Sequence, residues 1–168
     1  MVSVWHAWGA VLIASACGLP VAALVAWLLT KAGRPARYAV AEVGAVAGTL
    51  PWVWMILTPS PGTPRRVSLV PFADLGGSDL IVQIGGNLLV FAALGFFLPI
   101  RLPVGPWTVL LTAAAASSTV EVLQYVLDLG RVSSVDDVLL NAVGAALASL
   151  MSRHWWRQRV PPLAATAH

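Results

Sequence analysis

Long apolar runs alternate with short polar segments along this chain. Five stretches contain no charged residue; the longest is residues 1–30 and the shortest is residues 138–152. A helix needs about 20 apolar residues to cross a hydrocarbon layer of about 30 Å, and most of the five runs reach that length. The expected fold is all-α, a polytopic transmembrane bundle of about five spanning helices, near residues 5–29, 38–58, 81–100, 106–127 and 135–153.

Composition supports the membrane class. Hydrophobic residues make up 58% of the chain and charged residues 10%, against about 25% charged in an average soluble domain. A soluble bundle would need a solvated face on each helix, and the sequence shows no such periodicity. We expect a single membrane-embedded domain over residues 1–158, followed by a disordered tail over residues 159–168.

The positive charges are distributed unevenly between the two ends of the predicted bundle. Seven of the ten basic residues fall in the first and third connections or after the last helix: Lys31, Arg34, Arg37, Arg101, Arg153, Arg157 and Arg159. Under the positive-inside rule, the N-terminus lies outside the plasma membrane and the C-terminus is cytoplasmic. This distribution indicates the lipid bilayer as a partner and argues against nucleic acid, despite the net charge of +3.

Two further patterns concern the edges of the bundle. The connection over residues 59–79 begins with several prolines, and its Val67–Phe72 part could lie at the headgroup boundary, fold back over the bundle or form a plain loop. Seven of the tryptophans lie mostly near predicted helix ends, where indole rings favour the membrane interface, so we interpret them as anchors: Trp5, Trp8, Trp52, Trp54, Trp107, Trp155 and Trp156.

One group of polar residues interrupts the apolar second half of the chain. Glu121 follows 19 uncharged residues, and an ionisable group at membrane depth usually faces a bundle interior or a wet cavity. We expect a ligand-binding site formed by Asn87, Glu121, Gln124, Arg131, Asp136, Asp137 and Asn141.

Helix geometry indicates how these residues meet. The apolar part of the last predicted helix spans about 22 Å, too short for the hydrocarbon layer, so its acidic start lies near the outer headgroups. Glu121 and Gln124 share one helix face, and Asp137 and Asn141 share another, whereas Asp136 points about 100° away. Three helices thus carry polar groups to one depth.

Other roles stay open for several of these side chains. Arg131 could bridge one or more carboxylates and offer its remaining donors to an anionic headgroup. Ser134 followed by Asp136 and Asp137 also fits a helix N-cap with an acidic first turn. Asn87 and Gln124 could serve as hydrogen-bonding contacts between helices. No metal or cofactor is expected, because the three histidines are scattered and show no ligand spacing.

The polar residues of the second half of the chain, taken with the apolar residues around them, resemble the VanZ-like family of small integral membrane proteins. The resemblance begins at Leu69-Val70-Pro71-Phe72 and continues through the ordered set N-x-x-x-F, E-x-x-Q and R-x-x-x-x-D-D-x-x-x-N, which ends at Asn141. It covers residues 69–150, about half of the chain. Two positions depart from the family: Ala93 stands where proline is common, so we expect a softer kink in the third helix, and Ser134 stands where a further aspartate is common.

The resemblance implies a cell-envelope setting and a link to lipid-linked wall precursors or lipoglycopeptides. The family takes its name from a protein associated with teicoplanin-type glycopeptide resistance, but most members lie outside resistance clusters, so the resemblance alone does not imply resistance for this chain. It implies no defined reaction. Our first hypothesis is a module with an outward-facing polar pocket that recognises an amphipathic envelope ligand, either a lipid-linked precursor or a lipoglycopeptide.

Two alternatives stay open. An intramembrane enzyme acting on a lipid headgroup would use Glu121, the best candidate for a catalytic residue, as general base, with Asp136 and Asp137 as acid or as divalent-metal ligands. An ion-coupled transporter would also use Glu121; with five helices and no inverted repeat, it would require a homo-oligomer.

Overall fold

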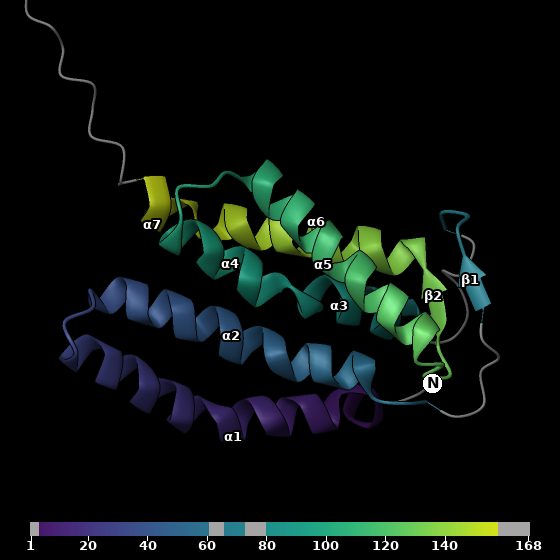
Figure 1. Ribbon diagram of the computed structural model, residues 1–168, viewed down its shortest axis with the longest axis horizontal. Coiled ribbons are helices and arrows are strands. Elements are labelled where there is room, and N and C mark those ends of the chain that lie inside the picture. Colours follow the sequence, from purple (N-terminus) through teal and green to yellow (C-terminus); the bar gives the residue numbers. More distant parts are fainter. Residues whose placement is uncertain (1–3, 61–65, 73–79, 158–168) are drawn as a thin grey trace, which may run out of the picture.

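The computed structural model describes residues 4–60, 66–72 and 80–157. Its long helices lie along one common direction in an elongated bundle (Figure 1). They are α1 (Val4–Lys31), α2 (Ala36–Leu57), α3 (Leu80–Val90) continued by α4 (Ala92–Arg101), α5 (Pro106–Val126) and α6 (Val135–Met151), and the short α7 (Arg153–Arg157) follows. The five predicted helices are all present. The predicted disordered tail, residues 159–168, lies outside the described residues.

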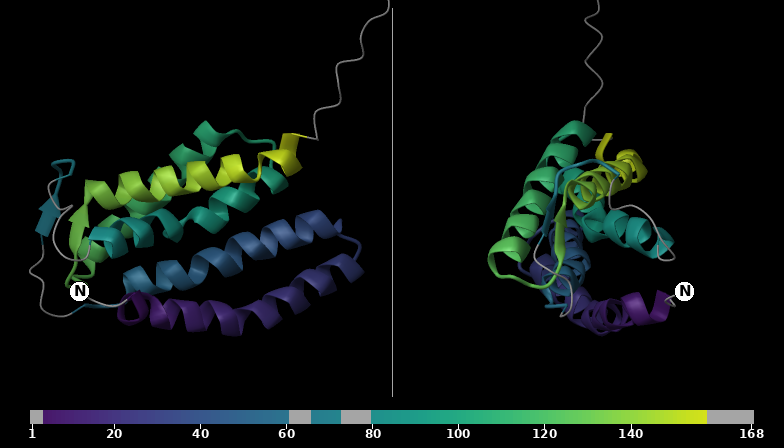
Figure 2. Two further views of the ribbon diagram at one scale, coloured as in Figure 1. Left: turned by 180° about the vertical axis from the view of Figure 1, so that it is seen from behind. Right: turned by 90° about the vertical axis from the view of Figure 1, so that its right-hand side faces the viewer.

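Four stretches of the described chain are long and apolar enough to cross a membrane: Trp5–Lys31, Ala36–Leu57, Leu80–Arg101 and Pro106–Val126. Helix α6 has 17 residues, or about 25 Å at 1.5 Å per residue, and lies alongside α5, α4 and α3. Figures 1 and 2 show the start of α1 and helix α7 at opposite ends of the bundle. The membrane helix bundle expected from the apolar runs is therefore confirmed.

The third crossing segment is broken at Phe91, which separates α3 from α4 two residues before Ala93. Both halves pack on α6 with almost no space between the backbones. A Cβ atom placed on Gly144 would lie 2.1 Å from the carbonyl oxygen of Leu88, and one on Gly95 would lie 2.1 Å from that of Ala145. Small residues permit this approach, and it fixes the depth of α3 relative to α6.

A feature that the all-α expectation missed lies at one end of the bundle. Strands β1 (Arg66–Ser68) and β2 (Val132–Ser134) form a two-stranded parallel sheet, with Ser68 opposite Ser134. The start of the Val67–Phe72 segment is therefore paired with β2 instead of forming a plain loop, and its position at the headgroup boundary stays a prediction. Main-chain pairing of this kind satisfies backbone groups that the helices cannot reach.

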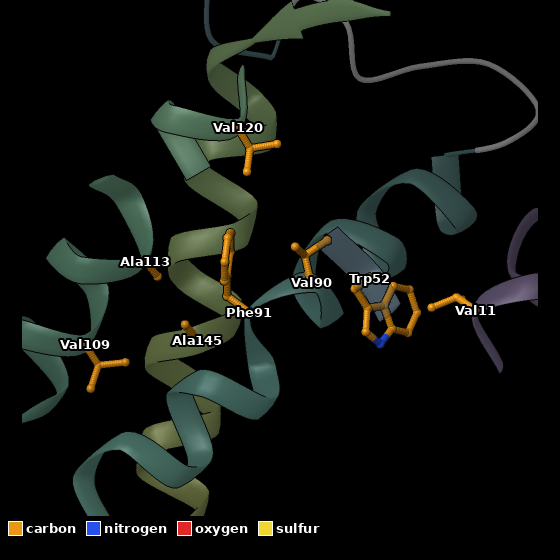
Figure 3. Close-up of a cluster of buried hydrophobic side chains, with 8 residues drawn as sticks. All are labelled: Val11, Trp52, Val90, Phe91, Val109, Ala113, Val120 and Ala145. Atoms are coloured by element: carbon orange, nitrogen blue, oxygen red, sulfur yellow. The ribbon is translucent and has the colours of Figure 1, made fainter. Parts of the chain in front are cut away.

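The apolar core lies between the helices, as Figure 3 shows for a cluster of eight buried side chains: Val11, Trp52, Val90, Phe91, Val109, Ala113, Val120 and Ala145. The rings of Trp8 and Trp52 meet edge to face with centroids 6.0 Å apart. For these two tryptophans the interpretation as interface anchors was wrong, because they pack inside the bundle. Most other large apolar side chains, including Trp107 and Trp155, are exposed on its outer surface, as lipid-facing residues are.

The bundle end formed by the α1–α2 turn and the end of α4 carries a charged network. Glu42 of α2 accepts hydrogen bonds from Arg34 and Arg101. The guanidinium groups of Arg37 and Arg101 lie 4.7 and 5.3 Å from the centre of the Tyr38 ring. This network lies at the end of the bundle remote from the small sheet (Figure 1).

Candidate functional site

Glu121 lies on the last turns of α5 and is 9% exposed. Its Oε2 accepts a hydrogen bond from the main-chain N–H of Ser134 at 2.9 Å. The hydroxyl of Ser133 donates to the main-chain oxygen of Glu121 at 2.9 Å. Both bonds between strand β2 and α5 thus involve Glu121. The Glu121 carboxylate has a main-chain N–H donor, and none of the salt bridges found among the described residues involves it.

The start of α6 has the N-cap predicted from the sequence. The side chain of Ser134 accepts from the N–H of Asp136 at 3.1 Å, and two acidic residues occupy the first turn, where the helix dipole favours them. Asp136 is 1% exposed, and its Oδ1 accepts from the N–H of Phe72 at 2.6 Å. This aspartate thus holds the segment that follows β1.

Three carboxamides connect neighbouring helices around a common space. Asn87 of α3 donates to Oδ1 of Asp137 on α6. Asn141 of α6 donates to the hydroxyl of Ser117 on α5 at 2.7 Å. Gln124 of α5 donates to the carbonyl of Ile56 on α2 at 2.9 Å. The hydrogen bonds between helices expected for Asn87 and Gln124 are confirmed.

Arg131 reaches the end of α2. Its Nε and Nη2 donate, at 3.3 Å each, to the carbonyl oxygens of Thr58 and Met55. A cation at this position stabilises the negative end of the helix dipole. Burial lowers the pKa of Arg131 below its ordinary value, and the nearby charges of Asp137 and Glu121 oppose this shift. Arginine stays protonated under such conditions, so the site keeps one positive charge beside its carboxylates.

Six of the seven predicted residues line one polar cavity, which we call the head cavity. It has a volume of about 270 Å³ and is lined by Ile56, Ser60, Asn87, Glu121, Gln124, Gly130, Arg131, Val132, Asp137 and Asn141. Asp136, the seventh, is not among the lining residues. A second cavity of about 330 Å³ shares Asn87, Arg131 and Asp137 with it and extends to Trp8.

An apolar groove adjoins the head cavity at Glu121, which lines both. The groove has a volume of about 330 Å³ and is formed by β1 and the residue after it, by α5, by β2 and by the start of α6: Val67, Leu69, Ser118, Glu121, Val122, Tyr125, Ser133, Ser134, Val135 and Val138. Sequence reasoning missed this groove. The semi-apolar run that begins at Val67 was its only sequence signal.

The chemistry of the site is that of hydrogen bonding and charge recognition. Among the described residues no group of three His, Cys, Asp or Glu side chains lies close enough to hold a metal ion. The head cavity instead combines two carboxylates, one guanidinium and three carboxamides, contributed by α3, α5, α6 and the connection before β2. Such a set can orient a polar group at the edge of an apolar region.

Comparison with known proteins gives one match. No curated protein and no solved structure is significantly similar to the chain. The family described as VanZ/LLP1 matches residues 45–157, which include all seven candidate residues and both strands. The match covers more than half of the chain and agrees with the resemblance in its ordered polar residues. The chain is therefore a membrane protein that belongs to the VanZ/LLP1 family.

Proposed function

We propose that this VanZ-family protein recognises an amphipathic ligand of the cell envelope, either a lipid-linked precursor or a lipoglycopeptide. The observation that carries the proposal is that Glu121 lines both the polar head cavity and the apolar groove. A ligand with a polar head and an apolar chain could occupy both spaces at once. Small-molecule sites commonly combine apolar walls with a few fixed polar groups in this way.

The polar groups of the head cavity are held in place before a ligand arrives. Asn87 is hydrogen-bonded to Asp137, Gln124 to the end of α2, and Glu121 to Ser134. Because their positions are fixed by neighbours, little side-chain entropy is lost when a head group binds. The apolar groove contains Val122 and Val138 on adjacent helices, which suits a hydrocarbon chain.

The proposal includes an orientation in the plasma membrane. The end of the bundle remote from the head cavity carries a concentration of basic residues, namely Lys31, Arg34, Arg37, Arg101 and Arg153. The positive-inside rule assigns that end to the cytoplasm. The head cavity then faces the outer leaflet, where lipid-linked wall precursors and lipoglycopeptides are accessible. A link to teicoplanin-type resistance would follow from binding such a ligand there.

Mass-spectrometric identification of ligands that copurify with the protein tests the proposal. The wild-type protein should carry an amphipathic envelope compound at a level well above its share of the membrane. Glu121→Gln, which alters the wall shared by cavity and groove, should lower that level several-fold. Glu42→Gln removes a carboxylate at the remote end and should leave it unchanged. Equal ligand profiles in all three proteins would refute the proposal.

A further inference from the structure

The carboxamide side chains that line the head cavity act as hydrogen-bond donors to other atoms of the protein. The side-chain N–H groups of Asn87, Gln124 and Asn141 each donate to an oxygen of the protein, namely Asp137 Oδ1, the Ile56 carbonyl and the Ser117 hydroxyl. Two N–H groups of Arg131 are used in the same way at the end of α2. Each carboxamide therefore uses one of its two N–H donors, and Arg131 two of its five, on oxygens of the protein.

One acceptor of the cavity is left without a partner. Asn141 lines the head cavity and is 2% exposed. Its Oδ1 is buried and receives no hydrogen bond from any residue that the structure describes. A buried carbonyl oxygen without a donor is unfavourable and is uncommon in folded proteins. A ligand that brings an N–H or O–H group to this oxygen would satisfy it.

The charges of the cavity also favour a hydrogen-bond donor over a phosphate. Two carboxylates, Glu121 and Asp137, lie around the single guanidinium of Arg131, and both interact with its charge. A phosphate placed among them would meet two like charges and a cation that those charges already compensate. A sugar hydroxyl or an ammonium group would meet acceptors on several sides.

We propose that the part of the ligand head group that enters the head cavity is a hydrogen-bond donor, a sugar hydroxyl or an amine, and that any phosphate stays outside. The inference rests on the proposed function and specifies its ligand. Asn141 Oδ1 accepts from the donor in the head cavity, while the chain attached to the head group occupies the groove beside Glu121.

Three single-chain probes that share a dodecyl tail separate the head-group classes: dodecyl glucoside, dodecylamine and dodecyl phosphate. Their binding to the purified full-length protein is measured by native mass spectrometry, each below its critical micelle concentration. We expect the glucoside or the amine to bind at least tenfold more tightly than the phosphate. Preference for the glucoside identifies sugar hydroxyls as the donors, and preference for the amine identifies an ammonium group.

A matched pair of variants links this preference to Asn141. Asn141→Leu removes the unpaired oxygen while keeping the branching and the number of side-chain heavy atoms, and should weaken the preferred probe about tenfold. Thr49→Val removes a different buried oxygen without a partner among the described residues, in α2 outside these cavities, and should leave binding unchanged. If Asn141→Leu does not fold, binding of the preferred probe is measured for Asn141→Ser instead. The comparison of the three probes on the wild-type protein still tests whether the head group is a hydrogen-bond donor.

The outcomes distinguish the two proposals. Equal or tighter binding of dodecyl phosphate overturns the inference about donors but leaves recognition of an amphipathic ligand in place. Unchanged binding by Asn141→Leu also overturns the inference. If no probe binds and no envelope compound copurifies with the wild-type protein, both proposals fail.

Discussion

The carboxylate of Glu121 accepts a hydrogen bond from the main-chain N–H of Ser134 at 2.9 Å, which joins α5 to the residue that caps α6. A carboxylate placed after a long uncharged run thus has a structural partner in the backbone. The same residue lines the polar and the apolar spaces of the site. Substitution can separate the structural role of Glu121, its bond to Ser134, from its role as a wall of the cavity and the groove.

Glu121→Leu should destabilise the protein, whereas Glu121→Gln should not. Glutamine keeps an oxygen that can accept from Ser134, but leucine leaves that buried N–H unpaired, which costs about 1–3 kcal/mol. Thermal unfolding of the two variants in the same detergent checks this. A leucine variant as stable as the glutamine variant would show that the bond to Ser134 contributes nothing measurable.

Gly144→Ala should weaken the packing of α3 on α6. The added Cβ would lie 2.1 Å from the carbonyl oxygen of Leu88, so one backbone must move, at a cost of about 1–3 kcal/mol or more. Gly18→Ala is the control, since a Cβ there meets nothing within 4 Å and alanine is the better helix former. The melting temperature should fall for Gly144→Ala and hold or rise for Gly18→Ala; equal values would contradict the close approach.

Asp136→Leu should release the segment around Phe72 from the end of the bundle. Asp136 Oδ1 accepts from the N–H of Phe72 at 2.6 Å, and Phe72 has a φ of 66°, a conformation that a bulky residue adopts only when its surroundings hold it. Hydrogen exchange at Phe72 and along β1 should accelerate about fivefold to tenfold, as loss of a net hydrogen bond of about 1–1.5 kcal/mol implies. Asp136→Asn keeps an acceptor and should exchange much like the wild type. Equal exchange in both variants would contradict this role for Asp136.

Cysteine labelling tests the orientation. In a Cys17→Ala background, Asp128→Cys introduces a thiol at the exposed end of the bundle near the head cavity, and Arg153→Cys places one at the remote, exposed end. A membrane-impermeant maleimide should label residue 128 in intact cells and residue 153 only after permeabilisation. The reverse result would place the head cavity on the cytoplasmic side.

The sequence predicted the helices and six of the residues that line the head cavity, because both depend on local patterns. Charge-free length marks the spanning helices, and the high energetic cost of Glu121 at membrane depth points to an interior cavity. Helical spacing also separated Asp137 and Asn141, which line the head cavity, from Asp136, which does not. These arguments need only the residue types and the helix period.

Features that depend on the main chain or on distant segments could not be predicted. The pairing of β1 with β2 and the bonds from Arg131 to Met55 and Thr58 end on backbone atoms, which every residue carries. Trp8 lies inside the bundle because Gly85 and Gly86 leave room for its ring. This contact joins α1 to α3, and neither the tryptophan nor the glycines alone predict it.

Photocrosslinking in cells tests the central claim most directly. A photoreactive residue at Val122 lies in the groove, and one at Leu111 lies on the exposed surface of the same helix, outside the cavities described above. We predict that residue 122 captures one amphipathic envelope compound far above its membrane abundance and that Glu121→Gln abolishes this enrichment, while residue 111 captures bulk phospholipids. Identical bulk lipids at both positions would contradict recognition of a ligand at this site.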